Sequence, residues 1–350
     1  MKHAIGGLVI AFVVAGCRPM DGVVVRSDPA PSSAPPNPTS ATTATPSTRA
    51  SVDFVLQEYP LPRGQGPHDV APARDGGVWY TAQLSGELGW LDPKFGVTKA
   101  INLGAGSAPH GVIVGPDGAP WVTDGGQNAI VRVDPVTSEV KRFALPANRP
   151  NANLNTAVFD EDGRTLWFTG QSGVFGRLDT QTGAMTVSDA PRGAGPYGIA
   201  SCPDGAVYYA SLAGSYVGRI VKETGGATVL VPPTAGQGAR RVWCDSKSRV
   251  WVSEWNAGQL ARYDGTGWKE WKLPGRGPEA YAVFVDDADV VWVTEWDANA
   301  LVRFDPTTET FVVRAHPAPN ANVRQLLGRH GEVWGAMSGQ DKLVVARPAG

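Results

Sequence analysis

The feature that most constrains this chain is a unit of about 42 residues that occurs seven times. In its clearest copy, the polar turn Asp286–Asp289 is followed by the apolar strand Val291–Glu295. The central aromatic residue recurs every 41 to 46 residues, at Trp79, Trp121, Trp167, Tyr208, Trp251, Trp292 and Trp334. Repeats of this length built from short strands are typical of propellers, in which each repeat forms one four-stranded sheet. The sequence therefore predicts an all-β fold, a seven-bladed β-propeller over residues 53–350.

Hairpin signals separate the strands within a repeat. The turn Gly115–Gly118 contains an Asp-Gly pair between two apolar runs, and the same pair recurs at residues 75–76, 162–163 and 204–205. The 43 glycines and 29 prolines supply further turns, and the 12 tryptophans supply bulk for a core. We interpret the repeated tryptophan as packing between blades rather than as a ligand-binding residue.

The first strand of the fold, residues 54–61, resembles the end of a repeat rather than its start. The last repeat, after Trp334, reaches the chain end before it forms such a strand. A propeller that closes on itself leaves no unpaired sheet edge between its first and last blades. We therefore expect the N-terminal strand to complete the blade of Trp334 and close the ring.

The N-terminal segments differ from the repeats in composition. Residues 1–17 contain a short apolar run, Ile5 to Val14, and end in Val14-Ala15-Gly16-Cys17. This segment resembles a lipoprotein signal in which Cys17 is lipidated. An ordinary secretory signal is the alternative. Residues 18–52 are rich in Pro, Ser, Thr and Ala, which predicts a disordered linker. We expect an extracytoplasmic protein held to a bacterial membrane only through its lipid, on the periplasmic face or the cell surface.

The charge balance limits the classes of partner. Charged residues make up 18% of the chain and the formal net charge is −2. Nucleic-acid-binding proteins need an excess of basic residues, so we expect no nucleic-acid partner. We expect a monomer.

Two cysteines remain in the predicted propeller, Cys202 and Cys244. An even pair in an oxidising compartment can form a disulfide, and a buried cysteine can also be a small apolar residue. The two cysteines are offset by one residue within their repeats, and neighbouring positions of a strand face opposite sides. This offset favours two buried thiols, and the disulfide stays open as an alternative.

One column of the repeat is polar in every copy and should lie where the innermost strand enters the ring. Its members are His68, His110, Asn155, Tyr197, Arg240, Tyr281 and Arg324. Side chains in this column are expected to line the mouth of the central channel, where they either bind a ligand or only hydrate the channel. Tyr281, His68 and His110 are the candidate catalytic residues.

Short motifs of the repeats resemble the virginiamycin B lyase family. They lie at residues 66–69, 108–111, 195–199 and 292–299, and the resemblance extends from about residue 53 to residue 347. It implies a seven-bladed propeller that opens the ring of type B streptogramins by a magnesium-dependent carbon–oxygen elimination. It also implies a histidine in the sixth ring position, a Glu-x-His in the last repeat, and a further glutamate after the last tryptophan.

The chain departs from the family at each of these positions. The sixth ring position is Tyr281, the last repeat has Asn322 and Arg324, and Met337 and Ser338 follow the last tryptophan. An amide and a guanidinium cannot replace a carboxylate ligand and an imidazole base, because magnesium prefers anionic oxygen and a guanidinium keeps its protons. We therefore expect weak or absent family activity.

One repeat earlier, Glu279, Tyr281 and Glu295 reproduce the spacing of the family set. Together with Glu254, the two glutamates Glu279 and Glu295 form a candidate site for Mg²⁺. The principal hypothesis is a propeller that binds a small molecule or peptide at the channel mouth. The alternatives are a lyase that uses this shifted site with His68 or His110 as base, a gluconolactonase-like metal-dependent hydrolase, and a non-catalytic protein-interaction propeller.

Overall fold

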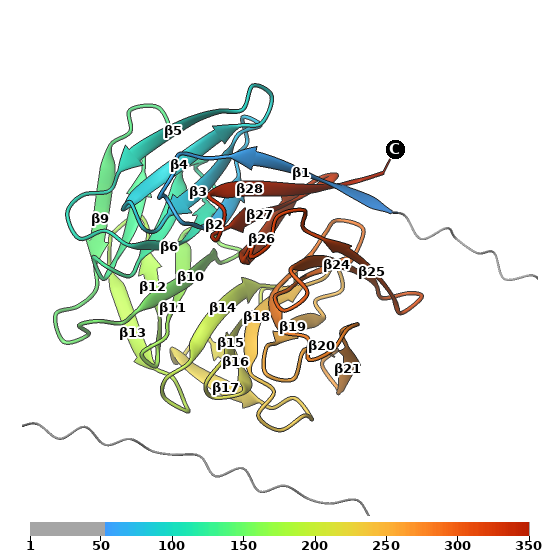
Figure 1. Ribbon diagram of the computed structural model, residues 1–350. Coiled ribbons are helices and arrows are strands. Elements are labelled where there is room, and N and C mark those ends of the chain that lie inside the picture. Colours follow the sequence, from blue (N-terminus) through green and yellow to red (C-terminus); the bar gives the residue numbers. More distant parts are fainter. Residues whose placement is uncertain (1–52, 350) are drawn as a thin grey trace, which may run out of the picture. The chain divides into compact units, whose positions relative to one another are not determined.

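The computed structural model describes residues 53–349, and all of their regular secondary structure is β-strand. The expected lipidation at Cys17 and the expected linker at residues 18–52 lie outside the described residues. No helix in the described part of the chain is long and apolar enough to cross a membrane. Seven four-stranded antiparallel sheets are arranged as blades around a common axis (Figure 1). This confirms the predicted seven-bladed propeller.

The strands follow one another from the axis outward within each blade. Blade 1 contains β2 (Pro67–Pro72), β3 (Val78–Ala82), β4 (Glu87–Asp92) and β5 (Val97–Asn102). Blade 2 contains β6 (Pro109–Val114), β7 (Pro120–Asp124), β8 (Ala129–Val133) and β9 (Val140–Ala144). Blade 3 contains β10 (Leu154–Phe159), β11 (Thr165–Gly170), β12 (Val174–Asp179) and β13 (Met185–Asp189). Blade 4 contains β14 (Pro196–Ser201), β15 (Val207–Ser211), β16 (Tyr216–Val221) and β17 (Gly226–Leu230).

The remaining blades follow the same plan. Blade 5 contains β18 (Ala239–Cys244), β19 (Val250–Glu254), β20 (Gln259–Tyr263) and β21 (Trp268–Lys272). Blade 6 contains β22 (Ala280–Val285), β23 (Val291–Glu295), β24 (Ala300–Asp305) and β25 (Thr310–Ala315). Blade 7 contains β26 (Val323–Arg329), β27 (Glu332–Met337), β28 (Lys342–Pro348) and β1 (Phe54–Pro60).

Strand β1 closes the ring. It pairs with β28 in antiparallel register from Phe54 opposite Pro348 to Pro60 opposite Lys342. In Figure 1 the first and last strands lie side by side. The innermost strands of the first and last blades are also neighbours. The expected completion of the Trp334 blade by the N-terminal strand is therefore confirmed.

The recurring aromatic residue packs between blades, as expected. All seven copies are buried, with exposures between 0% and 6%. Several indole N–H groups also donate to the turn aspartate of their own repeat, as Trp251 does to Asp245 and Trp292 does to Asp286, each at 2.8 Å. These bonds satisfy the polar atom of a buried indole and hold the turn against the strand.

The innermost strands carry a β-bulge near their first residue. In blade 1, for example, the register shifts between Pro67 and Val70. A bulge adds a residue to one strand and breaks the strict alternation of faces. As a result, both His68 and Asp69 reach side chains of other blades near the axis.

The expectation of two buried thiols at Cys202 and Cys244 is wrong, because the structure joins them in a disulfide with a Cα–Cα distance of 5.2 Å. The alternation argument applies within a strand, whereas Cys202 follows the last residue of β14 and lies in the turn. The two residues also belong to different sheets. Their approach depends on how blades 4 and 5 stack, which strand alternation does not describe.

A candidate ligand site at the axis of the propeller

Each of the seven ring residues is the second residue of its innermost strand, Arg324 included. Five of the seven side chains are buried, and Arg240 and Arg324 are partly exposed. The ring therefore fills the axis at this level instead of lining an open mouth. A ligand that approaches from solvent meets the two arginines first.

On one side of the axis lie the two histidines. The rings of His68 and His110 are 3.7 Å apart, centre to centre. His68 donates from Nδ1 to Asp69, whereas both nitrogens of His110 are within hydrogen-bond distance of Asn155. Burial lowers the pKa of both histidines well below the ordinary value, and the nearby arginines act in the same direction. Both imidazoles are therefore neutral at pH 7.

A buried ion pair crosses the axis. Arg241 of blade 5 donates from Nη2 to Asp69 of blade 1 at 3.1 Å, and from Nη1 to Thr156 of blade 3 at 2.7 Å. Asp69 and Arg241 are 1% and 4% exposed. Breaking a buried pair leaves an uncompensated charge, which typically costs about 3–5 kcal/mol. The pair therefore fastens three blades together.

The other side of the axis is built on Tyr281. Trp296 stacks on its ring with centroids 4.7 Å apart, and the Arg240 guanidinium lies 3.6 Å from the ring centre. The hydroxyl of Tyr281 is 2.8 Å from that of Tyr197, and it accepts a hydrogen bond of 3.4 Å from Nη1 of Arg324. Tyr281 is 1% exposed, so its phenol has no direct contact with solvent.

The two tyrosines titrate in opposite directions. Burial raises the pKa of Tyr197 to about 12, with the neighbouring Tyr281 acting in the same direction. Burial also acts to raise the pKa of Tyr281, but Arg240, Arg241 and Arg324 outweigh it and lower that pKa below the ordinary value. The three guanidinium groups thus make the axis electropositive.

Two further aromatic residues frame the exposed end of the site. Trp255 lies 4.7 Å from the Arg240 guanidinium, and Trp296 lies 5.3 Å from that of Arg324. Both tryptophans are partly exposed and contact each other edge to face at 5.9 Å. Sequence reasoning did not single out Trp255, Trp296, Asp69 or Arg241. The two tryptophans could have been found from the repeat, because each directly follows the glutamate that ends the second strand of its blade.

The three candidate metal-binding glutamates have separate environments. Glu295 accepts backbone N–H groups from Glu279, at 2.8 Å, and from Asp297 and Ala298. Glu254 accepts a bond from Gln259 at 2.6 Å. Within residues 53–349, the single group of three or more metal-ligating side chains close enough to share an ion is His68, Asp69 and His110. The structure does not gather the three glutamates into such a group.

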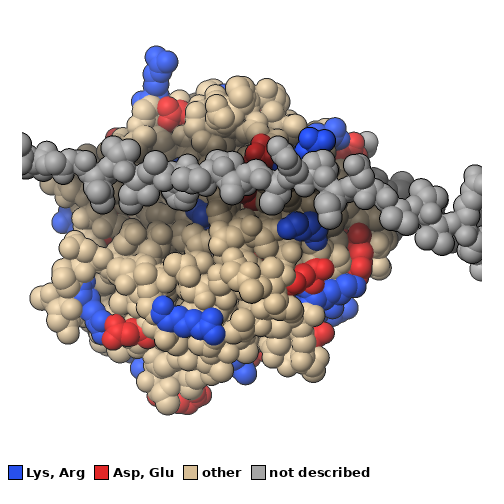
Figure 2. Space-filling model, turned by 60° about the horizontal axis from the view of Figure 1, so that its bottom comes forward, with Lys and Arg blue, Asp and Glu red and all other residues tan. Residues whose placement is uncertain are grey.

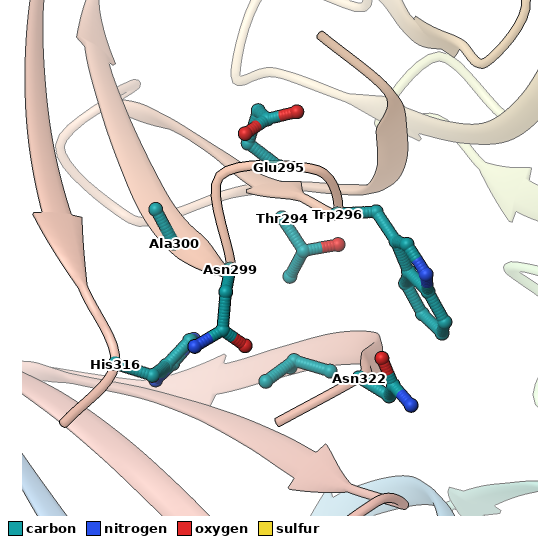
Figure 3. A pocket seen from close by; sticks show the side chains of 8 residues that line it. Thr294, Glu295, Trp296, Asn299, Ala300, His316 and Asn322 are labelled. Atoms are coloured by element: carbon teal, nitrogen blue, oxygen red, sulfur yellow. The ribbon is translucent and has the colours of Figure 1, made fainter. Parts of the chain in front are cut away.

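Figure 3 shows the surroundings of Glu295. Its carboxylate lies above the turn that carries Asn299, while His316 and Asn322 lie below that turn. The cavity between them has a volume of about 10 Å³, which is room for about one water molecule. Burial lowers the pKa of His316 to about 4, so this side chain is neutral. The cavity is too small for an organic ligand.

The residues that replace the family's Glu-x-His in the last repeat do not fit Mg²⁺. Asn322 stands at the implied ligand position and Arg324 at the implied base position, where Arg324 donates from Nε to Ser338 at 2.8 Å and from Nη1 to Tyr281. A guanidinium repels a cation, and the nearby donors are neutral amide and hydroxyl groups rather than the anionic oxygens that Mg²⁺ prefers. The His68, Asp69 and His110 group suits a transition metal better than Mg²⁺, and Arg241 already holds its carboxylate.

Comparisons with known proteins place this geometry in context. The sequence profile of the virginiamycin B lyase family matches residues 56–344. No curated protein matches the chain. Among solved structures, selenomethionine-substituted virginiamycin B lyase from Staphylococcus aureus is 22% identical with a TM-score of 0.78, covering 85% of this chain and 100% of its own.

Two other solved structures are similar to a comparable degree. A streptogramin B lyase is 23% identical with a TM-score of 0.77, covering 85% of this chain and 98% of its own. A catalytically inactive virginiamycin B lyase from Staphylococcus aureus with quinupristin is 22% identical with a TM-score of 0.78, covering 85% and 100%. At these identities the likeness shows the fold.

Proposed function

The chain belongs to the virginiamycin B lyase family. We propose that its propeller binds a ligand at the exposed end of the axis but does not catalyse the elimination that the family resemblance implies. The observation that carries the proposal is the position of Arg324, which bridges Tyr281 and Ser338 where the family resemblance implies a base and metal ligands.

The elimination requires a base that can reach the substrate. Positioned general bases typically contribute about 10²–10⁴-fold to a rate. Here the nitrogens of His110 face Asn155, Nδ1 of His68 faces Asp69, and the Tyr281 hydroxyl is buried against Tyr197 and Arg324. These contacts support a structural role for the two histidines and Tyr281 rather than proton abstraction from a bound ligand.

Ligand binding is supported by the side chains near the axis that solvent can still reach. Arg240, Arg324, Trp255 and Trp296 are the partly exposed side chains around Tyr281. They combine charged donors with flat apolar surfaces, which is a common composition of small-molecule sites. Each guanidinium is already held against an aromatic ring, so little side-chain entropy is lost on binding.

The test is incubation of the purified full chain with quinupristin and excess Mg²⁺, followed by mass spectrometry for the linear product. We expect no linear product above a protein-free control. Calorimetric titration of the chain with Mg²⁺ should show no saturable binding. Linearisation that depends on both Mg²⁺ and the chain would contradict the proposal.

We further propose that the protein is a lipoprotein facing an extracytoplasmic space, since residues 14–17 resemble a lipidation signal. The disulfide between Cys202 and Cys244 supports an oxidising compartment. The substitution Cys17→Ser should move the protein from the membrane fraction to the soluble fraction or block its processing. Unchanged fractionation of that variant would count against lipidation.

A further inference from the structure

We propose that the axial site is specific for a small organic anion, whose carboxylate or phosphate group is held by Arg240 and Arg324 and whose apolar body lies against Trp255 and Trp296. This inference rests on the proposed binding function and adds the chemical class of the ligand.

The two arginines converge on one place although they come from blades 5 and 7. The Arg240 guanidinium lies 3.6 Å from the ring centre of Tyr281, and Nη1 of Arg324 lies 3.4 Å from the hydroxyl of the same residue. Both guanidinium groups therefore flank a single side chain of blade 6. Planar guanidinium groups match the paired oxygens of carboxylates and phosphates.

Within residues 53–349, neither Arg240 nor Arg324 has a carboxylate within ion-pair distance, whereas the deeper Arg241 pairs with Asp69. Two acids of blade 6 are also relevant. The carboxylate of Glu295 accepts backbone N–H groups. Burial, Asp297 and Glu295 raise the pKa of Glu279, and Arg240 acts on it in the opposite direction without forming an ion pair.

Hydrogen-bonding capacity is also left over. The Nε atom of Arg240 is buried and has no acceptor among the described residues, and its Nη2 donates to the neutral hydroxyl of Tyr197. An anion bound beside this guanidinium would supply a stronger, charged acceptor. Cation binding is opposed by the same charges, which agrees with the poor fit of Mg²⁺.

Space for the body of the ligand lies beside Trp255. A hollow of about 450 Å³ is lined by Trp255, Asn256, Lys272, Pro278 and Glu279, among others. That volume is within the range of small-molecule sites. Trp255 lines this hollow, and its ring also lies 4.7 Å from the Arg240 guanidinium. A ligand of modest length can therefore place its acid near the arginines and its apolar part along the indole.

The experiment uses isothermal titration calorimetry of the full chain with four small aromatic probes. Indole-3-acetate and phenyl phosphate are anionic, indole-3-acetamide is neutral and tryptamine is cationic. We expect at least one anionic probe to bind about tenfold more tightly than the amide, since a hydrogen bond to a charged acceptor is stronger than one to a neutral acceptor. The affinity should fall with increasing salt. The two anionic probes distinguish a carboxylate from a phosphate ligand.

Arg324→Gln should weaken the anionic probe about tenfold or more and leave the amide unchanged, because it removes the charge but keeps a polar side chain. Arg324→Lys should restore part of the affinity. The matched control is Arg219→Gln on an exposed position of β16, which should bind like the unsubstituted chain.

The outcomes separate the two proposals. Equal affinity for the acid and its amide, or tighter binding of tryptamine, overturns the anion inference and leaves the binding function standing. Absence of binding by every probe at millimolar concentration overturns both. The comparison of acid with amide needs only the unsubstituted chain, so it holds even where an arginine variant fails to fold.

Discussion

Two glutamates at the same place in neighbouring blades show how far one residue's role depends on its surroundings. Glu254 is the last residue of β19 and Glu295 is the last residue of β23. Glu295 accepts three backbone N–H groups. Glu254 is 0% exposed, receives one bond from Gln259, and has Oε1 buried without a partner. Burial raises the pKa of Glu254 to about 8, so this glutamate is largely protonated at pH 7.

The raised pKa predicts that Glu254 destabilises the fold in alkaline solution. Its folded pKa of about 8 lies above the unfolded value of 4.5, so the destabilisation grows as the pH rises from about 4.5 to 8. Glu254→Gln keeps a partner for Gln259 and removes the ionisation. We expect this variant to be more stable at pH 8 by roughly 1–2 kcal/mol and equally stable near pH 4. Thermal unfolding at both pH values measures this.

The matched control is Glu295→Gln. The same substitution there weakens three backbone hydrogen bonds to a charged acceptor, so it should lower the unfolding temperature at pH 8. Destabilisation by both substitutions would show that Glu254 acts as an ionised carboxylate.

At the scale of elements, β1 has the largest consequence for the fold. Its first residue, Phe54, is 1% exposed and packs edge to face on Trp292 of blade 6, with ring centres 4.9 Å apart. Near its end, Tyr59 packs on Trp334 of blade 7 at 5.4 Å. One strand therefore contacts two blades and covers the edge of β28, which would otherwise be open to pairing with another chain.

Phe54→Ala should destabilise the propeller by about 3–5 kcal/mol, because it removes a large buried side chain and leaves a cavity. Its neighbour Val55 is 55% exposed and faces the other side of the strand, so Val55→Ala should change the stability by less than about 0.5 kcal/mol. Denaturant unfolding of the two variants measures the difference. Equal effects would show that β1 does not hold the ring through its buried face.

At the scale of the whole molecule, two long-range links hold the described residues together. Strand β1 joins the first part of the propeller to the last, and the Cys202–Cys244 disulfide joins blades 4 and 5. Figure 2 shows one outer face on which acidic and basic side chains are scattered among uncharged residues. Several charged side chains of the described residues form ion pairs, as Arg164 does with Asp179. The electropositive axis therefore contrasts with a mixed outer surface, and this contrast favours anion binding at one place.

The repeat alone was enough to predict the architecture. The spacing of the tryptophans, the Asp-Gly turns and the displaced first strand led to seven blades and to the pairing of Phe54–Pro60 with β28, as observed. The ring residues could also be placed, since each innermost strand begins at the same point of its repeat. These features are encoded within about forty residues, where turn chemistry and strand alternation act directly.

The contacts between residues of different blades became visible only in the folded structure. Asp69 and Arg241 are 172 positions apart and occupy the same position, the third residue of the innermost strand, in blades 1 and 5. The disulfide joins non-equivalent positions of adjacent blades, and five of the seven ring side chains are buried. Such contacts depend on the width of the ring and on how adjacent sheets stack. Comparison of the repeats with one another shows where each side chain lies along its strand. It does not show which residue of another blade that side chain meets across the axis.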